Sequence, residues 1–372
     1  MSHEPQDLPL TAENVDFVDD TLDVELQVPD FDSSFENVDV VDDTLDVDVQ
    51  VPDFDSSFDG SWKTPLMADW IERGIVLSAG PKESWDARLH GMITPCSVIK
   101  KDGIYFLYYL GADGDRSSDS GPRHRALGVA VSTDGIHFTK YSRNPILTYL
   151  PHNNEEEGIF SAAALLDNNG DVVIYYGAMD AGSSTSESVD GDIRLAISED
   201  GYNFQEIGDV VSHSDSSILG YGDELFPTGA IQLDNKWVVY YIAKAPGTAS
   251  GASWDIGMIW GSSKNNLEIS KEVLSYSAKI GSCEPILVKP NVISLFFTIM
   301  PETSDARTIE VRNSPIDTPN ELSPIIQEYQ FFDWDHGTIF LDKERSMWFF
   351  YYLTDDGQRI NVKTAPAQLN AN

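Results

Sequence analysis

Five short apolar runs, each with two adjacent aromatic residues, recur along the chain after about residue 60. The aromatic pairs are Tyr108-Tyr109, Tyr175-Tyr176, Tyr240-Tyr241, Phe296-Phe297 and Tyr351-Tyr352. Their first residues are 67, 65, 56 and 55 positions apart. Each run follows another apolar segment and a polar turn, which predicts a β-hairpin at each of the five places.

A third apolar segment follows each hairpin, as in ALGVAVSTDG and IRLAISEDG. One small antiparallel sheet cannot bury both of its faces without neighbours, so five such units predict an all-β, five-bladed β-propeller with little helix. The segment 64–80 precedes the first unit, and we expect it to pair with the last one and close the ring.

The first 60 residues follow a different pattern. Residues 13–35 recur at 36–58 with 20 identical positions, and each copy alternates apolar with polar or acidic residues over one short strand. A hairpin of two such strands would be only marginally stable by itself, and the like charges of the two strands repel. We therefore predict a duplicated acidic tail at 1–60 and a propeller at 61–372. The tail is either a docking peptide for a protein partner or a solvated linker.

The formal charge of −37 argues against nucleic acid or an anionic membrane as a partner, because both require a basic surface. Residues 1–60 contain 19 of the 61 acids and no Lys or Arg. The start, MSHEPQDLPL, has no signal-peptide pattern, and the longest apolar stretch is too short to span a bilayer. The sequence thus predicts a soluble protein, cytoplasmic or associated with a particle.

The two cysteines, Cys96 and Cys283, lie in apolar surroundings and are expected to be buried structural thiols rather than a disulfide or metal site. The chain shows no glycine-rich phosphate loop, no Gly-x-Ser-x-Gly elbow and no zinc-ligand spacing.

Residues 74–114 and 127–147, which include SWDARLHGMITP and LGVAVSTDGIHF, resemble the first blade of the five-bladed propeller glycoside hydrolases. That superfamily includes arabinanases, β-xylosidases, invertases and levansucrases, and also the mannoside phosphorylases. The resemblance implies an enzyme that acts on an oligo- or polysaccharide. It implies no cofactor, with calcium at the central channel as the possible metal.

In this superfamily the reaction uses carboxylates from separate blades, near the starts of the innermost strands. One carboxylic acid protonates the leaving oxygen, while another carboxylate activates water or attacks the sugar. By resemblance Asp86 is the base or nucleophile, Glu224 the general acid and Glu157 the second-blade acid. Simpler interpretations are a turn acid for Asp86 and a solvated loop acid for Glu157.

Further residues near these positions are candidates for binding the substrate. They are Arg88, His90, Asp223, Glu284, Trp334, Asp335 and His336. The resemblance gives His336 the place of the superfamily's axial histidine. Glu284 directly precedes an apolar strand, where a buried carboxylate is costly unless it has a partner or a role.

The chain also departs from the superfamily pattern. Thr94-Pro95 stands where the arabinanase type has an Asp before the proline, and Ser161-Ala162 stands where another Asp is expected. These changes keep a second hypothesis open, a non-catalytic glycan-binding or structural module, for example in a virion or surface assembly, anchored by the N-terminal repeat.

Overall fold

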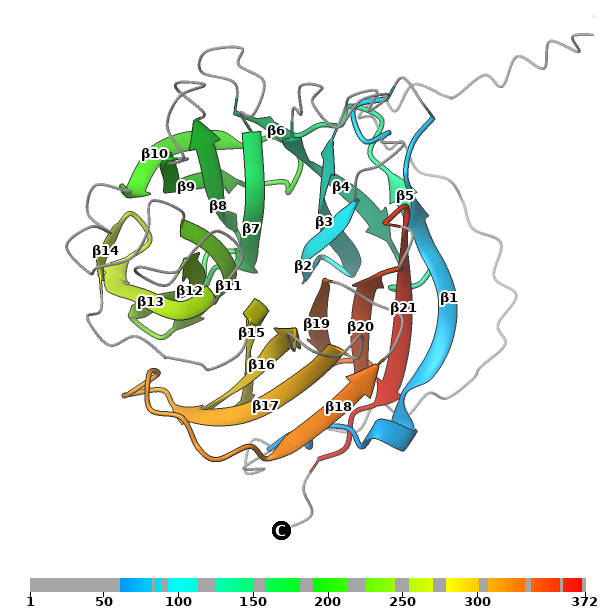
Figure 1. The fold of residues 1–372 in the computed structure, drawn as a ribbon, viewed down its shortest axis with the longest axis vertical. Coiled ribbons are helices and arrows are strands. Elements are labelled where there is room, and N and C mark those ends of the chain that lie inside the picture. The colour runs from blue at the N-terminus through cyan, green and yellow to red at the C-terminus, as the bar shows by residue number, and fades with distance from the viewer. Residues whose placement is uncertain are drawn as a thin grey trace, which may run out of the picture. The chain divides into compact units, whose positions relative to one another are not determined.

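The structure is a computed structural model (Figure 1). It describes residues 61–81, 84–87, 93–112, 125–149, 158–180, 190–212, 225–244, 254–269, 279–300, 307–331, 336–354 and 357–369. All of them belong to one compact unit, Ser57–Asn372. The predicted acidic tail and its repeat lie outside the described residues.

The described residues form antiparallel strands in five groups. Group 1 contains β2 (Thr94–Lys101), β3 (Ile104–Ala112) and β4 (Arg125–Ser132), with the short β5 (Thr139–Lys140) and β6 (Leu147–Thr148) on β4. Group 2 contains β7 (Gly158–Leu166), β8 (Val172–Asp180), β9 (Asp190–Ser198) and β10 (Gln205–Val211). Group 3 contains β11 (Leu225–Leu233), β12 (Lys236–Lys244), β13 (Trp254–Ser263) and β14 (Asn266–Ile269).

Group 4 contains β15 (Lys279–Lys289), β16 (Val292–Met300), β17 (Arg307–Pro315) and β18 (Gln327–Phe331). Group 5 contains β19 (Gly337–Asp342), β20 (Met347–Leu353), β21 (Arg359–Pro366) and β1 (Ile71–Ser78). A 3-10 helix, η1 (Met67–Asp69), precedes β1. The five predicted hairpins are confirmed, because the first two strands of every group pair in antiparallel fashion.

The first strands of the five groups form a closed ring. Strand β2 contacts β7, β7 contacts β11, β11 contacts β15, β15 contacts β19, and β19 returns to β2 (Figure 1). Groups 1 and 2 are also joined by a single parallel pair between Arg125 and Gly158. The prediction that segment 64–80 closes the ring is confirmed, since β1 pairs with β21.

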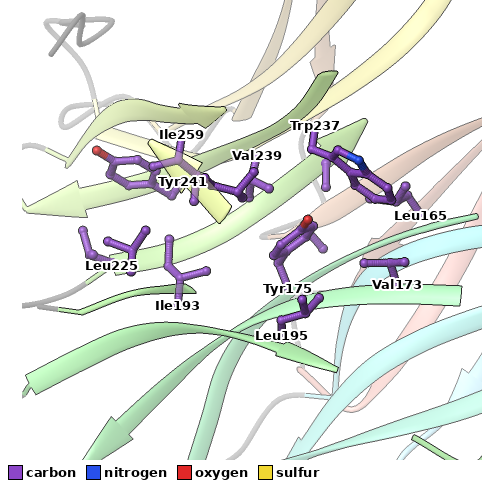
Figure 2. Packing of buried hydrophobic residues seen from close by; sticks show 14 of the residues in the cluster. Leu165, Val173, Tyr175, Ile193, Leu195, Leu225, Trp237, Val239, Tyr241 and Ile259 are labelled. Carbon is purple, nitrogen blue, oxygen red and sulfur yellow. The ribbon is translucent and has the colours of Figure 1, made fainter. Parts of the chain in front are cut away.

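A cluster of buried hydrophobic side chains fills each seam between neighbouring groups. Successive residues of a strand point to opposite faces, so each aromatic pair serves two seams. Tyr175, for example, packs with Val239 and Tyr241 at the seam between groups 2 and 3, as Figure 2 shows. Its neighbour Tyr176 packs with Tyr108 at the seam between groups 1 and 2.

Both cysteines are free thiols inside innermost strands, Cys96 on β2 and Cys283 on β15. Burial raises the pKa of Cys96 to about 12 and raises the pKa of Cys283 as well. Neither thiol is therefore ionised at neutral pH, in keeping with the predicted structural role. Among the described residues, no helix has the length and apolar character needed to cross a bilayer.

Candidate functional site

Three of the predicted site residues are described: Asp86, Glu284 and His336. The others lie outside the described residues, and their roles stay predictions. They are Glu157, Glu224, Arg88, His90, Asp223, Trp334 and Asp335.

Asp86 lies in the turn before β2 and is buried, with 3% of its surface exposed. Its carboxylate accepts a hydrogen bond from Ser84 Oγ at 2.7 Å and one from Tyr109 OH at 3.3 Å, and it forms an ion pair with Lys140 Nζ at 2.5 Å. Tyr109 is on β3 and Lys140 on β5, so Asp86 packs against the middle and outer strands of group 1 rather than the start of β2.

Similar triplets of a tyrosine, a carboxylate and a cation occur in two other groups. The three triplets are Tyr109–Asp86–Lys140, Tyr176–Glu206–Arg194 and Tyr352–Glu72–Lys363. In each, the second tyrosine of the aromatic pair donates to a carboxylate, and a cation contacts the carboxylate or the tyrosine. The contacts of Asp86 are thus those of a repeated scaffold element, and its catalytic role stays a prediction.

Glu284 lies on β15, the innermost strand of group 4, and reaches across to group 5. Its Oε2 accepts a hydrogen bond of 2.9 Å from Oγ1 of the buried Thr338 on β19. Each innermost strand has one residue opposite the first member of an aromatic pair. These residues are Ser97, Ala163, Gly229, Glu284 and Thr338. Group 4 alone has a large ionisable side chain at a position where the other groups have small ones.

The carboxyl group of Glu284 lies among atoms that exclude water, although part of the residue's surface is still accessible. This burial raises its pKa to about 8, and the hydrogen bond from Thr338 acts in the opposite direction. A carboxyl group with this pKa holds its proton at neutral pH, as a general acid must.

His336 immediately precedes β19. Its carbonyl oxygen accepts a hydrogen bond of 2.8 Å from the amide of Leu353, which fixes the backbone at this position. The proposed role of its imidazole as a contact to substrate or metal stays a prediction. Among the described residues, no group of three His, Cys, Asp or Glu side chains is close enough to hold a metal ion.

A feature that the sequence did not single out lies where β7 and β11 begin. The rings of Phe160 and Phe226 have centroids 6.3 Å apart at an interplanar angle of 34°, and the guanidinium of Arg125 lies 4.2 Å from the centroid of Phe160. We call these three residues the Arg–Phe–Phe ladder. Each phenylalanine follows a predicted acid, Glu157 or Glu224, by three or two positions, and this spacing was the available signal.

Neither a protein-family model nor a curated protein sequence matches this chain. Solved structures do match this chain. A structure of glycoside hydrolase family 130, described as mannoside phosphorylases that include hydrolases targeting β-1,2 mannosidic linkages in Candida mannan, is 14% identical with a TM-score of 0.57. It matches over 85% of this chain and 98% of its own.

A glycosyl hydrolase from Bacteroides ovatus is 13% identical over 84% of this chain and 96% of its own, with a TM-score of 0.52. The family 32 β-fructofuranosidase of Bombyx mori is 15% identical over 78% of this chain and 63% of its own, with a TM-score of 0.50. At such low identity the likenesses show the fold. The predicted resemblance to propeller glycoside hydrolases is confirmed at the level of the fold, which this chain shares with them at low sequence identity.

Proposed function

We propose that this protein is a five-bladed β-propeller that acts on a carbohydrate as a glycoside hydrolase does, with Glu284 as the acid that protonates the leaving oxygen. The five strand groups and their closed ring of innermost strands support the blade count. The similarity to glycoside hydrolase folds supports a carbohydrate as substrate, although a fold alone does not fix a function.

The observation that carries the proposal is the environment of Glu284. Burial favours the neutral form of its carboxyl group, and the hydroxyl of Thr338 holds one oxygen in place. A neutral carboxylic acid can give its proton to a glycosidic oxygen at neutral pH, and two carboxyl groups kept in different protonation states are the usual requirement for glycoside hydrolysis.

Glu284 thereby takes the general-acid role that the sequence analysis predicted for Glu224, and the second carboxylate would come from Glu157 or Glu224. These residues directly precede Gly158 and Leu225, with which β7 and β11 begin. Glycosidases place their two carboxyl groups roughly 5–10 Å apart. Asp86 is the weaker candidate for this role, because Lys140 and Tyr109 already occupy its carboxylate.

The test is hydrolysis of a panel of aryl glycosides and plant, algal and bacterial polysaccharides by the parent protein and by Glu284→Gln. We expect the parent to release sugar and the variant to be at least about 100-fold slower, because it cannot donate the proton. The parent rate should also fall as the pH rises through about 8, where Glu284 loses its proton. The matched control is Glu328→Gln, which changes an exposed acid on β18.

Hydrolysis at the parent rate by Glu284→Gln would exclude Glu284 as the acid. Glycan binding by the parent without release of sugar would favour the alternative, a glycan-binding or structural module. The observation that favours this alternative is that the carboxylate of Asp86 already binds Ser84, Tyr109 and Lys140.

A further inference from the structure

We propose that the Arg–Phe–Phe ladder is a sugar-stacking subsite in which Phe226 and Phe160 contact the apolar face of a neutral pyranose or furanose ring. This inference rests on the proposed function and deepens it, because it identifies residues that would hold the sugar whose bond is broken.

The first argument is position. Phe160 and Phe226 lie on β7 and β11, three and two residues after the predicted acids Glu157 and Glu224. Their ring contact brings the starts of β7 and β11 together. All three ladder residues keep part of their surface exposed, unlike the aromatic pairs in the seams, of which Tyr108 and Tyr175 are fully buried.

The second argument is the local backbone that places Arg125. Gly158 has a φ of +145°, and a Cβ at this residue would lie 2.5 Å from the carbonyl oxygen and 2.7 Å from the amide nitrogen of Arg125. Only glycine allows the two backbones to approach so closely. This approach, at the single parallel pair that joins groups 1 and 2, sets the guanidinium over one face of Phe160.

The third argument is the contact path from the ladder to Glu284. Two residues after Phe226, the hydroxyl of Thr228 accepts a hydrogen bond of 3.2 Å from the amide of Cys283, the residue before Glu284. The ladder and the proposed acid therefore lie on consecutive innermost strands. A sugar stacked on these two rings would lie next to β15, the innermost strand of group 4.

The chemistry fits a neutral sugar. Phenylalanine offers an apolar face and no hydrogen bond, and carbohydrate rings present a face of C–H groups that packs on such surfaces. We therefore expect both rings to contribute to the affinity for the sugar.

The test is calorimetric titration of the full-length protein with sucrose, β-1,2-mannobiose, arabinobiose and xylobiose. Where a sugar binds to the parent, we expect Phe226→Leu and Phe160→Leu each to weaken binding about tenfold, and Phe226→Tyr to keep it within about twofold. The matched control is Trp260→Leu, which removes a partly exposed ring that also has a cation, Lys236, over its face but lies on β13, away from the ring of innermost strands.

A second measurement does not depend on the folding of a leucine variant. The parent is labelled with 4-fluorophenylalanine, and the fluorine signal of Phe226, assigned by its absence in Phe226→Tyr, should shift as sugar is added. Unchanged affinity in both leucine variants, or an unshifted signal while sugar binds, would overturn the subsite and leave the proposed function standing. If no sugar on the panel binds to or is hydrolysed by the parent, the proposed function fails and the subsite fails with it.

Discussion

Four of the seams between neighbouring groups contain the same kind of tyrosine hydrogen bond, and the seam between groups 4 and 5 contains different ones. In the four, the first tyrosine of an aromatic pair donates to a backbone carbonyl in the next group, beyond that group's third strand. These bonds join Tyr108 to Gly201, Tyr175 to Lys264, Tyr240 to Pro319 and Tyr351 to Gly135, at 2.8–3.0 Å. In group 4 the same position holds Phe296, which has no hydroxyl to donate.

The reason lies in the connection within group 5. Its outermost strand, β1, comes from the other end of the described chain, so within residues 357–369 no turn leads from β21 to a fourth strand and receives a tyrosine. The segment before β1 accepts instead: Tyr329 OH donates to the carbonyl of Pro65 at 2.7 Å, and Trp348 Nε1 donates to that of Lys63 at 3.1 Å. Whether the first residue of an aromatic pair is tyrosine or phenylalanine thus depends on whether the next group has a backbone carbonyl that can accept its hydrogen bond.

The largest expected effect is on the exceptional seam. Trp348 is fully buried, contacts Phe296 and anchors the segment before β1. Trp348→Ala should lower the free energy of unfolding by about 3–5 kcal/mol, because it leaves a cavity and frees a carbonyl. Chemical denaturation measures this, with the exposed Leu66→Ala as a control that should change stability by no more than about 0.5 kcal/mol. A loss of no more than about 0.5 kcal/mol in Trp348→Ala would show that Trp348 does not anchor the segment before β1.

The next effect depends on pH. Glu284 joins group 4 to group 5, and its pKa rises from 4.5 to about 8 on folding. Below pH 4.5 Glu284 is protonated in both the folded and the unfolded state, so it does not lower the free energy of unfolding. As the pH rises from 4.5 to 8, only the unfolded state loses the proton, so stability falls, and above pH 8 the cost is complete.

Glu284→Gln removes this titration. We expect the variant to match the parent near pH 4 and to be more stable by up to about 4–5 kcal/mol near pH 9, since each unit of the rise in pKa corresponds to about 1.4 kcal/mol. Denaturation of both proteins at several pH values measures the difference, and Glu328→Gln should show no such trend. A stability difference that does not change with pH would mean that the carboxyl group is not buried as described.

The smallest effect concerns the four similar seams. Tyr351→Phe should lower the free energy of unfolding by about 1–2 kcal/mol, because the carbonyl of Gly135 loses its buried donor. Tyr108→Phe should behave alike at the seam between groups 1 and 2. Denaturation curves of both variants would test this. An unchanged free energy of unfolding in both would mean that these hydrogen bonds do not stabilise the fold and that the tyrosines act through packing alone.

The aromatic pairs were sufficient to predict the hairpins, and the closing segment was predicted from its place before the first hairpin. A strand with two adjacent large aromatic residues must bury both of its faces, which is a local property that the sequence displays. Even the exception was visible, because Phe296-Phe297 is the only pair without tyrosine.

The site was harder to predict. Asp86 and Glu284 were both predicted to lie just before innermost strands. Asp86 lies in an ion pair with a lysine 54 residues away, while Glu284 lies inside β15 and accepts a hydrogen bond from a threonine 54 residues away in another group. Which partner a carboxylate meets depends on strand register and on the packing of groups. The Arg–Phe–Phe ladder escaped prediction for the same reason, since its members come from three strands of three groups.

The pairing of β1 with β21 has a consequence for the order in which the molecule can form. Ile71 pairs with Thr364, near the opposite end of the described chain, so the sheet of group 5 cannot be completed until β21 has been synthesised. Groups 1 to 4 need only contiguous stretches and can form earlier. Because contacts this distant in sequence slow folding, the pairing of β1 with β21 is a late step, and β1, although synthesised first, stays an unpaired edge strand until β21 has formed.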